Sequence, residues 1–302
     1  MYYLAYGFFY LISLLPFRVI YFLSDGVYFL VYHVIGYRKQ MVTSHLIQTF
    51  PDMDTTERVK LIKKFYHNFC DLWFEMIKIL SMSKNEAAKR MKCDFTLFEE
   101  YYKSGKSIQM LCGHFINWEY LSVCVPDFQS YKSLAIFLSV RNKAMDRLIF
   151  GIRSKFGGVM LKAGNMDKEM QAWNDQQYLI FVAADQSPSN MGSTYWANFC
   201  NRPTGFIKGP WIRAARQGQP YTYLQTRKTK RGYYEFKALP FEDDPSKSSP
   251  GDLALKYIRM VEADIKEAPE LYLWTHNRWK RPWKPEYARK WVDTAPAPTL
   301  VN

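Results

Sequence analysis

From Ser107 onward, short apolar runs alternate with segments of helical period, and this alternation limits the folds open to the chain. The apolar runs predict strands, and the segments between them predict helices. Strands are expected at Ile108–Cys112, Leu134–Ser139, Tyr178–Ala183, Tyr221–Thr226 and Tyr233–Leu239, and helices at Asn142–Lys155, Asp167–Trp173 and Asp252–Lys266. Such alternation is typical of an α/β fold in which helices pack on a central sheet. A chain of 302 residues can bury a substantial core.

A histidine follows the first predicted strand. The stretch Ser107–Glu119 begins as an apolar run, breaks at Gly113 and delivers His114, with Glu119 five residues later. Asn117 is expected to cap a helix that places Glu119 in its first turn, from which the carboxylate can fold back toward the imidazole. A histidine at a strand end with a carboxylate in reach is the arrangement of a general base. Active sites of α/β sheets also collect at strand ends.

The N-terminus is strongly apolar. Within residues 1–37 the only formal charges are Arg18 and Asp25, and Pro16 separates two apolar pieces. The second piece has the length of about 17–25 residues that a bilayer span requires. We expect residues 1–36 to attach to a membrane, as one tilted span or as a monotopic helical hairpin. A hydrophobic hairpin buried in a soluble domain is the alternative.

The flanks of this apolar segment predict its processing and orientation. It lacks a basic n-region and an Ala-x-Ala cleavage site, so a removable signal peptide is not expected. Arg38 and Lys39 follow it and predict that the rest of the chain lies in the cytoplasm.

One domain is expected over residues 37–291. Asp54 and Glu57 resemble a capping box, and the apolar positions from Ile62 to Leu80 keep a helical period, so a long amphipathic helix is predicted there. The polar residues 81–92 predict a loop or a short surface helix. The tail 292–302 is expected to be disordered.

Charge and cysteine content restrict the partners and the compartment. The net charge of +13 predicts an anionic partner, which could be a nucleic acid, an anionic membrane or an acidic carrier protein. The basic excess lies late in the chain, at Arg202, Lys208, Arg213, Arg216, Arg227, Lys228, Lys230, Arg231, Arg278, Lys280, Arg281 and Lys284. Five cysteines without a CxxC pair argue against a disulfide framework or a zinc site and for a reducing compartment. A nucleic-acid-binding protein would explain the charge but not the apolar N-terminus.

Several stretches resemble a known family. His114-Phe-Ile-Asn-Trp-Glu119 is similar to the His-x4-Asp/Glu motif of the glycerolipid and lysophospholipid acyltransferase superfamily. Four further stretches resemble, more narrowly, the late acyltransferases of lipid A biosynthesis: Tyr37-Arg-Lys leading to Phe50-Pro51, Val140 to Gly157, Ala184-Asp185-Gln186, and Pro269 to Pro282. The resemblance is collinear from Tyr6 to Trp283. His45 and Asn277 depart from it, standing where the family has Asn and Arg.

The resemblance implies a fold and a reaction. The fold would be a mixed central sheet flanked by helices. The reaction would transfer a fatty acyl group from an acyl-carrier-protein thioester to a hydroxyl of a lipid A precursor, at the cytoplasmic face of a bacterial inner membrane. His114 would act as the general base, oriented by Glu119. The thioester co-substrate needs no further cofactor or metal, and the partners would be acyl carrier protein and an anionic glycolipid acceptor rather than nucleic acid.

Five residues are expected to bind substrate. They are Asn117, Arg141, Arg153, Asp185 and Gln186. A guanidinium fork suits a phosphate of donor or acceptor, and Asp185 and Gln186 follow a strand and would position the acceptor. Surface salt bridges for the arginines and structural bracing for Asp185 and Gln186 are the alternatives.

An acyl-enzyme nucleophile is not expected, because a thioester is already activated. The chain has no Gly-x-Ser-x-Gly elbow, and Cys112, which ends an apolar run, is expected to be a small buried core thiol. Other functions that fit the sequence are acyl transfer to another acceptor (a lysophospholipid, an aminolipid or a glycolipid) and a non-catalytic membrane scaffold.

Overall fold

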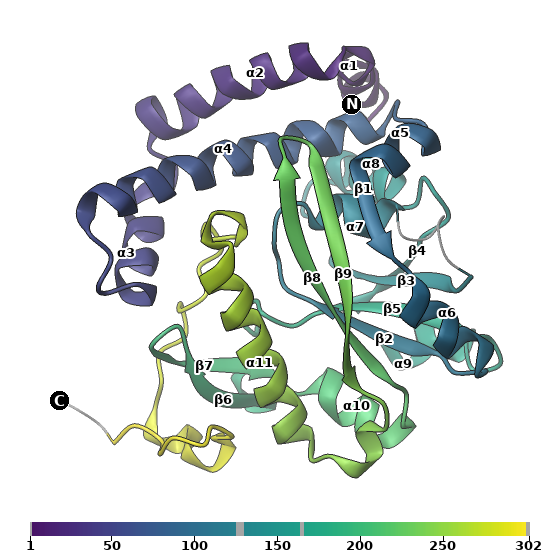
Figure 1. Ribbon diagram of the computed structural model, residues 1–302, viewed down its shortest axis with the longest axis vertical. Coiled ribbons are helices and arrows are strands. Elements are labelled where there is room, and N and C mark those ends of the chain that lie inside the picture. The colour runs from purple at the N-terminus through teal and green to yellow at the C-terminus, as the bar shows by residue number, and fades with distance from the viewer. Residues whose placement is uncertain (1, 125–129, 164–165, 300–302) are drawn as a thin grey trace.

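A mixed seven-stranded sheet forms the centre of the molecule (Figure 1). The computed structural model describes residues 2–124, 130–163 and 166–299. In order across the sheet the strands are β1 (Met91–Asp94), β9 (Tyr233–Glu242), β8 (Tyr221–Lys230), β2 (Ile108–Cys112), β5 (Tyr178–Ala183), β3 (Lys132–Phe137) and β4 (Val159–Lys162). Neighbouring strands are parallel except in the β8–β9 hairpin, which is antiparallel. The predicted α/β class with a mixed sheet is confirmed.

The two central strands β2 and β5 have the bounds predicted for them. All five residues of β2 and five of the six in β5 are buried, which explains why neither strand alternates between apolar and polar residues. The one polar residue in the two strands is the buried Gln109 of β2. β8 is longer than predicted because it extends toward the hairpin turn with the polar residues Arg227–Lys230. β9 is longer at its other end, where residues 240–242 pair with the buried start of β8 and Phe241 is buried.

Helices surround the sheet and follow the prediction closely in the second half of the chain. The predicted segments correspond to α8 (Lys143–Arg153), α9 (Met166–Gln171) and α11 (Pro250–Glu267). The other helices of the domain are α3 (Lys39–Thr49), α4 (Thr55–Ile79), α5 (Lys84–Arg90), α6 (Thr96–Lys103), α7 (Trp118–Cys124) and α10 (Gly209–Gln217). A separate antiparallel pair, β6 (Thr194–Phe199) and β7 (Arg202–Ile207), was not predicted.

The long helix α4 supports the N-terminal segment. As predicted, Asp54 caps it, since its carboxylate accepts hydrogen bonds from the N–H groups of Thr56 and Glu57. Along α4 lie α1 (Tyr2–Leu14), α2 (Phe17–Phe29) and the π-helical turn η1 (Leu30–Ile35) (Figure 1). The continuous helical stretch Phe17–Ile35 is long and apolar enough to cross a membrane, and only 17% of its most apolar window is buried against the domain.

The residues just after the expected domain, 37–291, pack against β6. The N–H of Val292 donates to the Trp196 carbonyl, and the Asp293 carboxylate accepts from the N–H of Asn198 and pairs with Arg259. These two residues are therefore part of the packing around β6. Residues 300–302 of the expected disordered tail lie outside the described residues.

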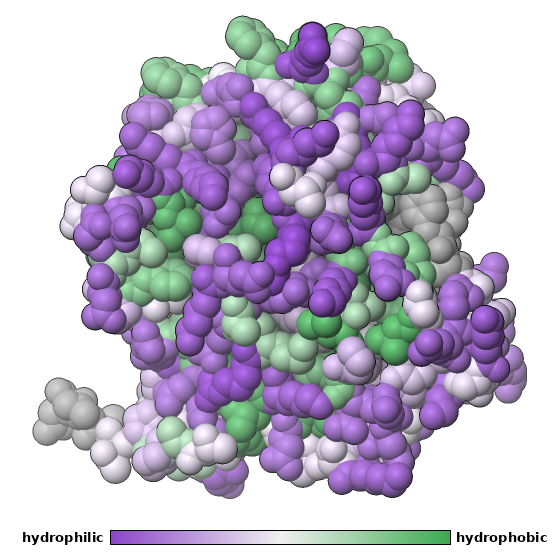
Figure 2. All heavy atoms as spheres, in the orientation of Figure 1, coloured by the Kyte–Doolittle hydropathy of each residue, from purple (hydrophilic) through white to green (hydrophobic). Residues whose placement is uncertain are grey.

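Part of the late basic excess is used inside the fold. Arg227 pairs with Asp264 and Glu267, Lys228 and Arg231 pair with Asp71, and Arg278 is 3% exposed. Others remain on the surface, including Arg216, Lys280, Arg281 and Lys284. The face drawn in Figure 2 is dominated by hydrophilic side chains.

Candidate active site

The register between β2 and β5 brings His114 and Asp185 together. Cys112 lies opposite Ala183 in the parallel ladder, and each strand ends at that residue. His114 and Asp185 are both two residues further along, so the two side chains meet at the same edge of the sheet. The Asp185 carboxylate accepts a hydrogen bond from the His114 backbone N–H at 3.1 Å and lies 2.6 Å from Nδ1 of the ring.

The surroundings of Asp185 favour its ionised form. The side chain is 1% exposed. Burial alone would raise its pKa, but the neighbouring His114, through its charge and its hydrogen bonds, and the Arg278 guanidinium hold the pKa of this carboxyl below its usual value. A charged carboxylate at Nδ1 fixes the ring orientation and favours a proton on that nitrogen.

Tyr257 of α11 holds the two strand ends together. Its hydroxyl donates to the carbonyl of Cys112 and accepts from the N–H of Ala184. The side chain is fully buried, and burial raises its pKa well above the usual range. The phenol is therefore neutral and can make both hydrogen bonds, which fixes the start of both loops that carry the site.

α7 begins with the predicted cap, Asn117. The predicted contact between Glu119 and the His114 ring is not formed. Asn117 caps the helix, because its Oδ1 accepts from the N–H of Tyr120 at 3.0 Å. Glu119 in the first turn accepts from Nε and Nη2 of Arg153, at 2.9 and 2.5 Å, and from the Trp118 indole. The role of holding Nδ1, expected of Glu119, belongs to Asp185. Glu119 instead forms a two-bond ion pair with α8.

This ion pair has both partners largely withdrawn from water. The Glu119 side chain is 3% exposed and that of Arg153 is 24% exposed. Burial alone would lower the pKa of Arg153, but the hydrogen bond and the charge of Glu119 raise it above its usual value. A fixed pair of this kind joins α7 to α8 across the site.

A largely apolar cavity of about 500 Å³ opens beside His114. His114, Glu119, Arg153 and Gln186 contribute its polar wall. Apolar side chains from α4, the sheet and α8 line the rest, among them Trp73, Met76, Ile136, Leu138, Ile149, Met160 and Phe181. A second cavity of about 600 Å³ shares Ile136, Ala163, Val182, Ile207 and Pro210 with the first, so the two adjoin.

Two residues predicted to bind substrate do not line this cavity. Asn117 is fully buried, and its amide donates to Glu75 at 2.8 Å while its oxygen caps α7. Both ends of this side chain are thus used inside the fold. Arg141 lies in the turn between β3 and α8 and is exposed, next to Val140 at the cavity rim.

Cys112 is a core thiol, as predicted. It is buried, and burial raises its pKa to about 12, so it carries no thiolate at neutral pH. Within the described residues, no three His, Cys, Asp or Glu side chains converge as a metal site would require.

The sequence did not assign four residues that shape the site. Tyr272 hydrogen-bonds Asp185, and the charge of the buried Arg278 helps to lower the pKa of this carboxyl. His276 accepts the Ser187 N–H at 2.9 Å, and burial lowers its pKa to about 4. Tyr272, His276 and Arg278 belong to the C-terminal stretch that carries the family resemblance, so a signal was present. Nothing in the sequence indicated a role for Tyr257, because it is one of several apolar positions on a helix.

Comparison with known proteins identifies the family. Residues 1–281 match the family described as bacterial lipid A biosynthesis acyltransferase. The chain belongs to this family. It is also 22% identical over 296 residues to the lipid A biosynthesis lauroyltransferase of Escherichia coli (strain K12), with 92% of this chain and 90% of that protein covered. Family membership confirms the resemblance read from the motifs, and with it that the protein is an acyltransferase.

Proposed function

We propose that this lipid A acyltransferase family member transfers a fatty acyl group from an acyl-carrier-protein thioester to a hydroxyl of a lipid A precursor. The observation that carries the proposal is His114, bound through Nδ1 to the buried Asp185, beside a largely apolar cavity. A general base next to an apolar chamber is what acyl transfer to a lipid alcohol requires.

The chemistry follows from the two ring nitrogens. With Nδ1–H donating to Asp185, Nε2 carries the lone pair and takes the proton of the acceptor hydroxyl. The oxygen then attacks the thioester carbonyl, and Asp185 stabilises the imidazolium that forms. As the tetrahedral intermediate collapses, the C–S bond breaks and the thiolate takes the proton back from the imidazolium. Base assistance of this kind is worth on the order of 10²–10⁴ in rate.

The other polar groups of the cavity wall position substrate. Glu119 holds the Arg153 guanidinium in place at the wall, where a positive charge suits the phosphate groups of the donor or acceptor. Gln186 faces the same cavity and would hydrogen-bond the acceptor. Arg141, exposed at the rim, would contact a phosphate outside the chamber, and the apolar lining would hold the acyl chain.

The positive charges of the chain support the proposed acyl donor and the proposed location of the enzyme. Arg216, Lys280, Arg281 and Lys284 are exposed cations on a chain of net charge +13, which suits an acidic carrier protein. Residues 1–36 would attach the enzyme to the bacterial inner membrane, with the catalytic domain on the cytoplasmic side where Arg38 and Lys39 lie.

The test is acyl transfer by the purified full-length protein. Labelled acyl carrier protein thioester and a lipid A precursor are incubated with wild type, His114→Ala and His33→Ala, and the lipid product is measured by mass spectrometry. His33 is an exposed histidine of η1 and serves as the control. Wild type and the control should add one acyl mass, and His114→Ala should not.

Other results would overturn parts of the proposal. Equal turnover by His114→Ala would remove the base assignment. Acylation of a lysophospholipid but not of the lipid A precursor would change the acceptor, and a preference for acyl-CoA would change the donor.

A further inference from the structure

The outward face of the N-terminal segment carries many exposed large apolar side chains. Tyr3, Leu4 and Phe8 of α1 and Phe22 of α2 are each more than 60% exposed, as are Val34 and Ile35 of η1. In Figure 2 green side chains gather along the top of the view, where Figure 1 places α1 and α2. Contiguous apolar surface of this kind marks a contact with lipid or protein.

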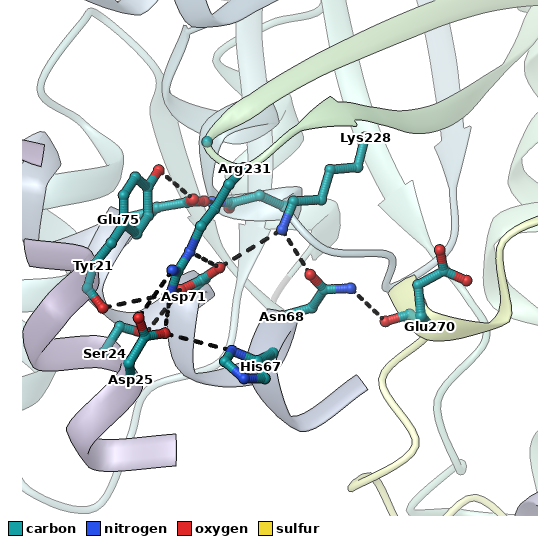
Figure 3. Close-up of polar contacts among 12 residues, drawn as sticks. Tyr21, Ser24, Asp25, His67, Asn68, Asp71, Glu75, Lys228, Arg231 and Glu270 are labelled. Carbon is teal, nitrogen blue, oxygen red and sulfur yellow. Dashed lines mark hydrogen bonds and ion pairs between the residues drawn. The ribbon is translucent and has the colours of Figure 1, made fainter. Parts of the chain in front are cut away.

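The inward face of α2 carries polar side chains that bind the domain (Figure 3), beside the buried Ile20. The Tyr21 hydroxyl donates to Glu75 at 2.9 Å, the Ser24 hydroxyl donates to Asp71 at 2.8 Å, and Asp25 lies 2.6 Å from Nη2 of Arg231 in the β8–β9 turn. Arg231 also binds Asp71 at 2.7 Å. The one acidic residue of the segment therefore faces the protein.

The contacts run along the whole length of α2. At its first turn Lys78 lies 5.4 Å above the Phe17 ring and donates to the carbonyls of Ser13 and Leu15. Near its other end Tyr28 stacks on His67 at 3.8 Å. Thus α2 lies antiparallel along α4 from one end to the other, as Figure 1 shows.

This arrangement is incompatible with α2 crossing a bilayer. A helix that is fastened lengthwise to α4 would carry α4 into the hydrocarbon with it. Lys60, Lys63 and Lys64 of α4 are exposed, and inside the hydrocarbon these lysines would lose the water around them, which is costly. The segment can meet lipid only along its outward face.

The charges at the edge of this face indicate which lipid. Residues 2–35 contain no acid besides the inward Asp25. Arg18 and Arg38 are exposed, and Arg147 of α8 lies 4.2 Å from the Tyr2 ring. Cations beside an apolar helical face are typical of attachment to anionic head groups.

The same contact joins this face to the mouth of the cavity. Arg147 belongs to α8, whose Ile149 and Arg153 line the cavity, and α1 packs on α8. The exposed apolar side chains Trp73, Leu138 and Val140 form part of the lining.

We propose that α1, α2 and η1 lie in the plane of an anionic lipid surface as a monotopic attachment, held to the catalytic domain by the Tyr21, Ser24 and Asp25 contacts, and that α2 does not span the bilayer. The inference rests on the membrane attachment in the proposed function and adds the orientation of the helices at the lipid surface. It also brings the cavity mouth near the lipid surface, from which a lipid acceptor can enter.

The test is thiol accessibility in cells expressing the full-length protein. Arg18→Cys changes an exposed residue at the end of α2 that is far from Arg38, and Lys280→Cys places a thiol on the catalytic domain. A membrane-impermeant maleimide is applied to intact spheroplasts and to lysed ones, with the unsubstituted protein as background. In-plane attachment predicts labelling of both variants only after lysis. Labelling of Arg18→Cys, but not Lys280→Cys, in intact spheroplasts would mean that α2 spans, and would overturn the proposal.

Fractionation separates this inference from the proposed function. Recovery of the unsubstituted protein in the soluble fraction would overturn both the in-plane attachment and the membrane location. Acyl transfer assayed in detergent tests the reaction by itself, so its loss would not bear on the position of α2.

Discussion

Two groups of buried acidic side chains lie on either side of the loop after β2, and they are used differently. Asp185 binds a histidine ring that is 20% exposed and lines the cavity. Asp71 and Glu75 are 1% and 0% exposed. Among the described residues, their partners belong to α2, to the β8–β9 hairpin and to the start of α7, and none of them lines the cavity. A buried carboxylate therefore indicates a reaction site only when its partner keeps a reactive nitrogen facing a cavity.

The largest effect is expected from removing the general base. His114→Ala should lower kcat by about 10²–10⁴ with little change in the unfolding midpoint, because a general base is lost from a partly exposed site. The measurement is steady-state acyl transfer together with thermal unfolding. A mutant that keeps its turnover would place the reaction elsewhere.

The next effect compares one carboxylate from each group. Asp185→Asn should lower kcat by about 10²–10³ and leave KM nearly unchanged, because the amide no longer fixes the Nδ1 proton or stabilises the imidazolium. Asp71→Asn is the matched control and should lower stability while kcat of the folded protein is kept. If both mutants lost the same fraction of kcat, the two carboxylates would not have the different roles assigned to them.

A third test removes the cation that joins α2 to α4. Arg231→Gln leaves Asp25 and Asp71 without their guanidinium. Because Arg231 is about a third exposed, solvent reduces the penalty, and we expect a loss of about 1–3 kcal/mol in the free energy of unfolding. Urea unfolding measures it, with Lys247→Gln, a surface pair to Asp244, as the control. An unchanged unfolding midpoint would show that the cluster does not hold α2.

The smallest effect is in the pH dependence of stability, and its sign differs between the groups. The pKa of Asp185 is lowered in the folded protein, so its contribution is present above the unfolded value of about 3.9 and is lost as the pH falls through the folded value. Burial and the neighbouring Asp71 raise the pKa of Glu75, so acidification toward about 4.3 should stabilise the fold through this group.

Two variants separate these signs. Glu75→Gln should remove the stabilisation on mild acidification, and Asp185→Asn should weaken the loss below pH about 4. Unfolding free energies measured across this range check both, and equal pH slopes in the two variants would contradict the assignment.

Much of the fold could be predicted because its main determinants are local. The strands β2 and β5 are mostly apolar runs between turn residues, and their bounds were predicted to the residue. Asp54 and Asn117 cap helices through contacts two or three residues away. Four-residue strands such as β1 and β4 carry too few residues for a period to show.

The pairing at the site depends on strand order, which a local pattern does not contain. The spacing of five residues suggested Glu119 as the partner of His114, whereas Asp185 reaches it from a strand 71 positions later. Only the neighbouring positions of β2 and β5 in the sheet make that contact. The ion pairs of Lys228 and Arg231 with Asp71 are likewise a tertiary effect, so the sequence alone predicted surface charge for both.

The most direct test of the central claim compares the two candidate carboxylates in one assay. Single-turnover acyl transfer from acyl carrier protein to a lipid A precursor is measured for wild type, Asp185→Asn and Glu119→Gln. If Asp185 orients His114, the chemical step should slow far more in Asp185→Asn than in Glu119→Gln, whose effect should fall mainly on substrate binding through Arg153. The reverse order, with Glu119→Gln the slower mutant and Asp185→Asn near wild type, would contradict the account.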